Sequence, residues 1–307
     1  MIKIDRDKNL IEKINKLKRQ RRAIILAHNY QLPEVQDIAD YRGDSLELSR
    51  IAAATDAKVI VFCGVHFMAE TASILSADKK VIVPDITADC PMANMLTARD
   101  MLRLKKEHPK AVVVGYVNTS AEVKAHLDYC CTSTNAVKVI NYLKYKKDII
   151  FVPDKYLADY VQKVTHKKLI AWNGFCPTHI RILARDIRRE KRFHPQAKVM
   201  VHPECLPETV ELADVVCSTS QMCRYVRESE AKEFIVGTEV GIIYRLKQDN
   251  PSKEFYPASE AAVCPNMKRT TQEKVLWALE ELKEEVRVFD DIRQRAKKAI
   301  ERMLQIK

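Results

Sequence analysis

The 307-residue sequence predicts an α/β protein made of three pseudo-equivalent αβα sandwich subdomains. Short β-branched apolar runs alternate with helical patterns along the chain, which is typical of parallel sheets covered by helices. Polar residues at the ends of these runs, and Cys–Pro dipeptides farther on, also recur at a constant spacing. A constant period indicates an internal structural repeat.

Eight apolar runs are expected to form strands: Ala23–Ala27, Val59–Phe62, Val81–Val83, Ala111–Val114, Ile149–Val152, Leu169–Ala171, Val199–Val201 and Phe234–Val236. A ninth and weaker candidate is Phe255–Pro257. The runs fall into three groups with helical patterns between them, so each group is expected to form one sheet.

Three strands end in polar residues that set the period: His28, Tyr116 and His202. Their separations are 116 − 28 = 88 and 202 − 116 = 86 residues. A Ser or Thr follows each tip by 17 residues and lies in a small polar cluster just before a helical pattern. That composition is expected of a helix N-cap, and the three residues concerned are Ser45, Ser133 and Thr219.

Cys–Pro dipeptides report the same period independently. Cys90, Cys176 and Cys264 each precede a proline, and their separations are 176 − 90 = 86 and 264 − 176 = 88 residues. Two unrelated markers therefore indicate one threefold repeat.

The repeat divides the chain into an N-terminal helix (1–22), three α/β repeats (23–108, 109–196 and 197–270) and a C-terminal helical segment (271–307). Ligands of α/β sheets collect at the carboxyl ends of the strands. Three repeats around a pseudo-threefold axis would direct their tips, hydroxyls and cysteines at one central active-site cavity. Amphipathic helices at about 8–21 and 272–305, the second broken near Asp290, are expected to close the structure.

The composition is that of a globular protein with a formal charge of +11. No apolar run approaches the roughly 20 residues of a membrane-spanning helix, and the charged N-terminus lacks a signal-peptide core. We therefore expect a cytoplasmic protein with no membrane partner. The basic runs lack interleaved aromatic residues, so we expect a solvated basic surface and no nucleic-acid partner.

Nine cysteines in such a protein are expected to hold metal, react or pack as small apolar side chains. No CxxC pair is present, so metal ligands must come from distant positions. The three Cys–Pro thiolates suit a cubane iron–sulfur cluster with one iron left open as a Lewis acid, which favours loss of water. A zinc ion with the same thiolates and a water satisfies the same count. The other six are expected to be packing residues: Cys63, Cys130, Cys131, Cys205, Cys217 and Cys223.

The strand tips supply the remaining polar groups of an active site. Imidazoles donate to anionic oxygens, phenols transfer protons, amides donate or accept, and a carboxylate serves as a general base. The candidate imidazoles are those of His28 and His202, and the candidate phenols those of Tyr30 and Tyr116. The candidate amide is Asn118, and the candidate general base is Glu204.

The Ser and Thr residues at helix N-termini are candidate anchors for a carboxylate or phosphate, because free N–H groups and the helix dipole favour negative charge there. His179, three residues after Cys176, is interpreted as an outer partner of the metal site or a structural residue. The same outer role is considered for three acids at other strand tips: Asp85, Asp154 and Glu239.

Nine segments together resemble the quinolinate synthase family over nearly the whole chain. They are Ala27–Gln31, Gly43–Ser45, Ala88–Cys90, Gly115–Ser120, Cys131–Ser133, Gly174–Cys176, His202–Cys205, Ser218–Ser220 and Cys264–Lys268. Their number and order make the resemblance specific.

The resemblance implies three similar subdomains around a pseudo-threefold axis and a 4Fe-4S cluster bound by Cys90, Cys176 and Cys264. It implies condensation of iminoaspartate with dihydroxyacetone phosphate to quinolinate, phosphate and water in NAD biosynthesis, with an oxidase or a dehydrogenase supplying the iminoaspartate. Matching positions imply substrate contacts from His28, Ser45, Tyr116, Asn118, Ser133, His202, Glu204 and Thr219, and catalytic roles for Glu204, Tyr116, Tyr30 and His202.

One departure from the family pattern concerns the third ligand. Some members have a CxxCxxC run there, whereas Ala258 and Ala261 occupy the two earlier places in this chain. Two alternatives stay open: another cluster-dependent hydro-lyase, and a non-catalytic iron–sulfur or zinc regulatory protein whose basic surface binds nucleic acid.

Overall fold

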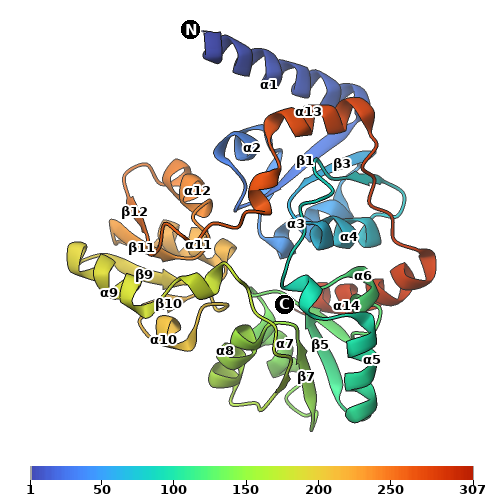
Figure 1. The fold of residues 1–307 in the computed structure, drawn as a ribbon, viewed down its shortest axis with the longest axis vertical. Helices are drawn as coiled ribbons and strands as arrows, with labels where there is room; N and C mark the ends of the chain where they lie inside the picture. Colours follow the sequence, from blue (N-terminus) through green and yellow to red (C-terminus); the bar gives the residue numbers. More distant parts are fainter. Residues whose placement is uncertain (1, 307) are drawn as a thin grey trace. The chain divides into compact units, whose positions relative to one another are not determined.

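The fold was obtained as a computed structural model that describes residues 2–306, with side-chain burial described for residues 8–306. Within this part of the chain, helices flank three parallel four-stranded sheets, as Figure 1 shows. The predicted α/β class with three αβα subdomains is confirmed. None of the described helices is both long and apolar enough to cross a membrane.

All three sheets have the same strand order. The first is β2-β1-β3-β4, the second β6-β5-β7-β8 and the third β10-β9-β11-β12. The first strand of each repeat therefore lies between the second and the third, so the chain reverses its direction of travel across the sheet beside this strand. The carboxyl ends of strands at such a reversal form the crevice in which α/β proteins bind ligands.

The strand bounds follow the sequence repeats. The first sheet comprises β1 (Ala23–His28), β2 (Tyr41–Gly43), β3 (Val59–Cys63) and β4 (Lys80–Ile82). The second comprises β5 (Val112–Tyr116), β6 (Tyr129–Cys131), β7 (Ile149–Val152) and β8 (Ile170–Ala171). The third comprises β9 (Lys198–Val201), β10 (Val215–Val216), β11 (Glu233–Gly237) and β12 (Glu254–Pro257).

All nine expected strands, including the weak ninth, are present. The sequence patterns missed β2, β6 and β10, which lie at the sheet edges and are two or three residues long. Such segments are too short to show a period of two residues. Their extended form is stabilised by pairing with β1, β5 and β9 instead.

Fourteen helices are assigned in the described residues. They are α1 (Ile2–Arg21), α2 (Pro33–Ile38), α3 (Ser45–Ala54), α4 (His66–Leu75), α5 (Ala98–Glu107), α6 (Ala121–Lys124), α7 (Ala136–Tyr142), α8 (Lys155–Thr165), α9 (Ala184–Phe193), α10 (Pro207–Val210), α11 (Thr219–Glu228), α12 (Ile242–Asp249), α13 (Gln272–Glu281) and α14 (Asp290–Gln305). The break expected near Asp290 is confirmed, because α13 ends at a left-handed Leu282 (φ 52°) and α14 begins at Asp290.

The chain forms two compact units. The first contains the residues up to Cys90 together with Pro265–Asp290, and the second contains Pro91–Cys264 and the residues from Asp291 onward. Unit 1 therefore holds the first sheet with α1 and α13, and unit 2 holds the other two sheets with α14. The predicted C-terminal segment 271–307 is thus divided between the units, and the domain boundaries stay predictions from the sequence period.

The helix that follows each Cys–Pro dipeptide packs beside a different sheet from the one that precedes the dipeptide. A helix begins eight residues after each cysteine (98 − 90, 184 − 176 and 272 − 264). In unit 2, α5 packs on α6 beside the second sheet, and α9 packs on β11 and α10 of the third sheet. In unit 1, α13 packs on α1, α2 and β3, and Figure 1 shows α1 and α13 side by side. The helix after each Cys–Pro dipeptide therefore packs on elements outside the repeat that carries its cysteine.

The repeat extends to individual side-chain contacts. Asp40, Asp128 and Asp214 each lie 12 residues after their strand tips. In every case the Oδ2 atom accepts a 2.8 Å hydrogen bond from a backbone N–H of the first strand, namely that of Ile25, Val113 or Val199. Equivalent carboxylates therefore fasten the loop before each edge strand to the centre of its sheet.

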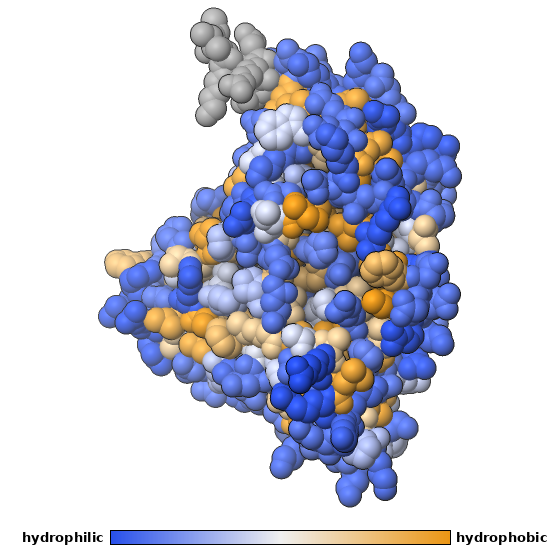
Figure 2. All heavy atoms as spheres, turned by 45° about the vertical axis from the view of Figure 1, so that its right-hand side comes forward, coloured by the Kyte–Doolittle hydropathy of each residue, from blue (hydrophilic) through white to orange (hydrophobic). Residues whose placement is uncertain are grey.

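Apolar side chains from strands and helices form the core. In unit 1, Ile25 and Val61 pack with Ile14 of α1 and with Val275 and Leu279 of α13. Burial of such side chains contributes roughly 1.5–3 kcal/mol each. Figure 2 shows mainly hydrophilic residues on the outer face that it draws, with apolar residues in separate groups among them.

Two buried polar side chains occupy equivalent positions beside the strand tips. Gln36 and Lys124 lie eight residues after His28 and Tyr116 and are almost completely buried. Gln36 Nε2 donates to the Gln31 carbonyl at 2.9 Å, and Lys124 Nζ donates to the Thr119 carbonyl. Both carbonyls belong to the third residue after the tip, so these side chains hold the loops that follow β1 and β5.

We predict that Lys124→Met lowers the free energy of unfolding by about 1–3 kcal/mol, because it leaves the buried Thr119 carbonyl without this donor. Lys124→Gln should lose less, since Gln36 makes the equivalent contact in the first repeat. Urea denaturation measures both variants. Equal losses for Met and Gln would show that packing of the side chain, and not its donor, stabilises the loop.

Candidate active site

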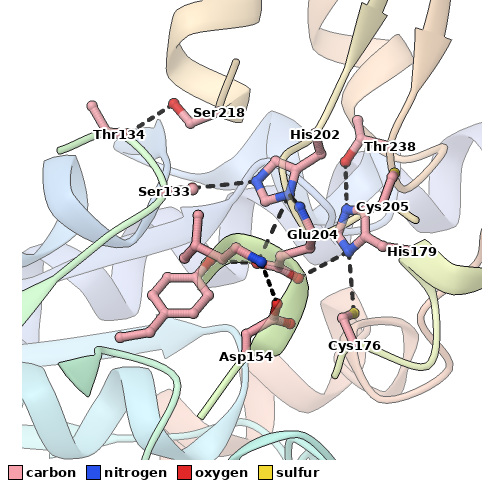
Figure 3. Close-up of polar contacts among 12 residues, drawn as sticks. Ser133, Thr134, Asp154, Cys176, His179, His202, Glu204, Cys205, Ser218 and Thr238 are labelled. Atoms are coloured by element: carbon pink, nitrogen blue, oxygen red, sulfur yellow. Dashed lines mark hydrogen bonds and ion pairs between the residues drawn. The ribbon is translucent and has the colours of Figure 1, made fainter. Parts of the chain in front are cut away.

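A buried polar network lies at the carboxyl ends of β5 and β9 in unit 2 (Figure 3). Its centre is Glu204, which is 3% exposed. The Tyr116 hydroxyl donates to Glu204 Oε1 at 2.5 Å, and His179 Nδ1 lies 3.0 Å from Glu204 Oε2. Both carboxylate oxygens are therefore held by side chains from the second repeat, which fixes the orientation of the carboxylate.

Burial by itself would raise the pKa of the Glu204 carboxyl. The adjacent imidazoles of His179 and His202 and the hydroxyl of Tyr116 outweigh burial and lower this pKa to about 2. Asp154 behaves in the opposite way, because its own burial and the neighbouring Glu204 charge raise its pKa well above the usual range. An ionised and a neutral carboxyl side by side is an arrangement suited to acid–base chemistry.

The two strand-tip histidines turn the same ring nitrogen, Nδ1, towards a backbone N–H. Nδ1 of His28 accepts the Tyr30 N–H at 3.2 Å, and Nδ1 of His202 accepts the Glu204 N–H at 3.4 Å. A neutral imidazole whose Nδ1 accepts carries its proton on Nε2. His202 Nε2 accordingly faces the Ser133 hydroxyl at 3.2 Å. Both side chains are therefore hydrogen-bond donors at the strand tips, which suits binding of an anionic oxygen.

His179, outside the predicted substrate and metal residues, lies within this network. Its ring stacks on that of His202 with centroids 4.5 Å apart, and its two nitrogens contact Cys176 and Thr238 as well as Glu204. The spacing of three residues from Cys176 was the only signal in the sequence. This spacing does not predict where the His179 side chain lies, because packing sets the turn after a Cys–Pro dipeptide.

The structure corrects the predicted N-caps: none of Ser45, Ser133 and Thr219 is the N-cap of its helix. Asp44 and Ser218 are the N-caps of α3 and α11, so Ser45 and Thr219 are the first helical residues. In the second repeat the Thr132 N–H donates to Asn135 Oδ1 at 2.8 Å, and Ser133 lies in the turn before α7. In the first and third repeats the capping residue directly precedes the predicted one, and its side chain accepts from the N3 amide, that of Glu47 or Gln221. In the second repeat the N-cap position of α7 is Asn135, two residues after Ser133. The predicted Ser and Thr hydroxyls are thus not the capping groups.

A hydrogen bond joins the Ser133 turn to the start of α11. The Thr134 hydroxyl donates to the Ser218 hydroxyl at 2.8 Å, and Gln221 Nε2 donates to the Thr134 carbonyl at 3.4 Å. Ser218 also caps α11, which begins at Thr219. The structure therefore connects the segments that carry two of the predicted anion-binding hydroxyls.

Asn118 carries a buried side-chain oxygen with no hydrogen-bond partner in the described part of the chain. An unsatisfied buried acceptor is costly and is expected to be used by a ligand or water. Asn118 lies two residues after Tyr116, the last residue of β5. A role of Asn118 in binding substrate stays a prediction.

Four predicted site residues belong to unit 1 and are described within it. His28 and Tyr30 pack edge to face with ring centroids 4.6 Å apart. Lys268, in the 3₁₀ turn that precedes α13 in the sequence, donates to the Tyr30 carbonyl at 2.5 Å. Ser45 begins α3, and Cys90 is the last residue of the first segment of the unit.

The three Cys–Pro cysteines adopt the same local structure. A 3₁₀ turn begins three residues after each of them, at Ala93, His179 and Met267. In unit 2 the loop before Cys176 needs a glycine, because a Cβ on Gly174 would lie 2.4 Å from the Pro153 carbonyl oxygen. Backbone amides are also fastened: Cys90 N–H donates to Asp89 at 2.7 Å and Cys264 N–H to Glu239 at 3.1 Å.

Burial separates these cysteines from five of the other six. Cys90, Cys176 and Cys264 are partly exposed. Burial raises the thiol pKa of Cys130 and Cys217 to about 12 and that of Cys63, Cys131 and Cys205 above the usual range, so these five remain protonated. Their predicted role as packing residues is consistent with this, whereas Cys223 is partly exposed.

One further group has the donor set of a metal site. Ligand atoms of Cys176, His179 and Glu204 all lie within 4.8 Å of one another. These features define an α/β protein with a buried acid–base network, which includes one metal-capable Cys/His/Glu group, at the carboxyl ends of parallel strands.

Comparison with known sequences gives the family. Residues 12–305 match the quinolinate synthetase A protein family, and the chain belongs to it. It is 57% identical over 295 residues to a quinolinate synthase of Thermodesulfovibrio yellowstonii, covering 96% of this chain and 97% of that protein. It is 55% identical to one of Dehalococcoides mccartyi over 294 residues (96% and 97%) and 54% identical to one of Methanosarcina barkeri over 298 residues (97% and 98%).

We predict that Glu204 makes stability depend on pH in acid. Its pKa is lower in the folded state than the ordinary 4.5, so its stabilising contribution is complete above pH 4.5 and is lost as pH falls towards about 2. The stability difference between wild type and Glu204→Gln should therefore shrink by an amount on the order of 1–3 kcal/mol between pH 5 and pH 3. Urea unfolding of both metal-free proteins measures it, and a difference independent of pH would contradict the ionised carboxylate.

Proposed function

We propose that this protein is a quinolinate synthase of NAD biosynthesis that condenses iminoaspartate with dihydroxyacetone phosphate to quinolinate, phosphate and two waters. Family membership over residues 12–305 carries the proposal. The Tyr116–Glu204 hydrogen bond supports it, because this condensation needs groups that move protons at a site closed to water.

We propose further that Cys90, Cys176 and Cys264 bind a 4Fe-4S cluster. Their donor chemistry fits, since thiolates are the ligands of such clusters and these residues are partly exposed, with the same turn after each. When bound, the cluster would supply an open iron that acts as a Lewis acid in the loss of water. One cluster for all three ligands requires the shared central cavity that the repeat predicts.

The chain's own residues would bind and orient the substrates. Nε2–H of His28 and His202 would donate to carboxylate or phosphate oxygens, in the tautomer set by the backbone. The hydroxyls of Ser45, Ser133 and Thr219 would anchor the same anions, because they lie at or beside helix N-termini without serving as the caps. Asn118 Oδ1 would accept from a substrate hydroxyl or imine N–H.

Glu204 would act as the general base. It is ionised, buried and held at both oxygens, so it can take a proton from carbon next to a carbonyl or imine group without reorienting. Tyr116, whose hydroxyl already donates to Glu204, would return that proton to a leaving hydroxyl. Tyr30 would serve as a second phenol. A cytoplasmic location and supply of iminoaspartate by an oxidase or dehydrogenase stay predictions.

We predict about four iron and four sulfide per chain after anaerobic reconstitution, lost in Cys90→Ala, Cys176→Ala and Cys264→Ala. Iron, sulfide and zinc analysis measures this. Cys223→Ala is the matched control, because Cys223 is the other partly exposed cysteine. Zinc without sulfide would favour the alternative of a single zinc ion, and iron that is indifferent to the three substitutions would refute the assignment of the ligands.

We predict that Tyr116→Phe and Glu204→Gln each lower quinolinate formation by about 10²–10⁴-fold while the cluster content is unchanged. Product analysis with the two proposed substrates measures this. A regulatory protein would tolerate both substitutions and bind nucleic acid with a strong salt dependence. Failure of the fully clustered wild type to form quinolinate would favour a different cluster-dependent hydro-lyase.

A further inference from the structure

His179 is buried between the metal-ligand candidate Cys176 and the carboxylate of Glu204 (Figure 3). It is 3% exposed, and its Nδ1 atom lies 3.1 Å from Cys176 Sγ and 3.0 Å from Glu204 Oε2. A sulfur and a carboxylate oxygen are both acceptors once Cys176 is a thiolate. Nδ1 must then carry a hydrogen, which two acceptors share.

Thr238 supports this tautomer from the other side of the ring. Its Oγ1 lies 2.8 Å from His179 Nε2, and a hydroxyl can donate to a nitrogen that lacks a hydrogen. Thr238 directly follows β11, and the next residue, Glu239, accepts the Cys264 N–H at 3.1 Å. The end of β11 therefore contacts His179 through Thr238 and the Cys264 backbone through Glu239.

The distances favour hydrogen bonding over coordination of one ion by the same three residues. Tetrahedral zinc with ordinary bond lengths places its nitrogen about 3.6 Å from a sulfur ligand and about 3.4 Å from an oxygen ligand. The observed separations of 3.1 and 3.0 Å are shorter and lie within hydrogen-bonding distance. The stacked His202 ring restrains His179 further.

We propose that His179 is a positioning residue that donates one Nδ1–H to both the Cys176 sulfur and the Glu204 carboxylate, and that Thr238 selects the tautomer that does so. This proposal rests on the cluster assignment made above. The hydrogen bond joins the proposed general base to one cluster ligand. His179 thus orients Glu204 and withdraws electron density from the Cys176 sulfur.

Hydrogen bonds to the sulfurs of an iron–sulfur cluster set its reduction potential, and their loss makes the cluster harder to reduce. The test is therefore a redox titration of the reconstituted protein, followed by its electron paramagnetic resonance signal. His179→Gln, whose amide matches the Nε2 position, should shift the midpoint potential to a more negative value. His179→Asn, whose amide nitrogen matches Nδ1, should lie closer to wild type.

Thr238 provides an independent pair of variants. Thr238→Val should shift the potential in the same direction as His179→Gln, and Thr238→Ser should restore the wild-type value. His194→Gln is the matched control, because His194 also stacks on an aromatic ring, that of Tyr256, and lies 3.8 Å from the Glu233 carboxylate, outside the network. It should leave the potential unchanged.

The outcomes separate the proposals. A wild type that takes up no iron and sulfide refutes the cluster assignment itself. A clustered protein whose potential is the same in wild type, His179→Gln and Thr238→Val refutes the role of His179. Loss of all bound metal in His179→Gln and in His179→Asn would also refute it, since His179 would then be a ligand. If the His179 variants fail to fold, the Thr238 pair decides.

Discussion

The position of the first strand of each repeat, between the second and the third, is the constraint on which the rest of the structure depends. It makes the chain reverse direction across every sheet, and α/β proteins bind their ligands beside such a reversal. The polar tip residues His28, Tyr116 and His202 lie at the end of this strand or directly after it. Asp40, Asp128 and Asp214 fasten the loop before each edge strand to this strand in all three repeats.

A buried carboxylate shapes the site in unit 2. An ionised Glu204 is tolerated only because Tyr116 and His179 each hold one of its oxygens. The same contacts hold the carboxylate in one orientation, which the proposed role of Glu204 as a general base requires. Asp154 is buried beside it, its Oδ2 has no hydrogen-bond partner among the described residues, and burial raises its pKa well above the usual range. The charge on Glu204 and its fixed orientation therefore depend on the same few hydrogen bonds.

Much of the fold could be predicted because strong β-branched runs and a repeated spacing survive in a single sequence. The sequence patterns did not predict the edge strands β2, β6 and β10, because their extended form comes from pairing with a neighbouring strand and not from their own composition. The N-caps were placed one residue late, since Asp44-Ser45 and Ser218-Thr219 each offer two capping side chains and only backbone geometry selects between them. The sequence indicated an outer or structural role for His179 but not its position in the network, because its contacts with Glu204 and Thr238 join residues far apart in sequence.

The sequence by itself determined the α/β class, the threefold period, the three Cys–Pro cysteines and the polar residues at the strand tips. These are local properties, because a strand, its tip and its following turn are encoded within a few residues. Only the tertiary structure decided which elements each helix packs on, which groups surround each histidine nitrogen, and that neighbouring groups lower the pKa of Glu204 while burial raises that of Asp154. Those properties depend on burial and on contacts between residues tens of positions apart, which a linear pattern does not record.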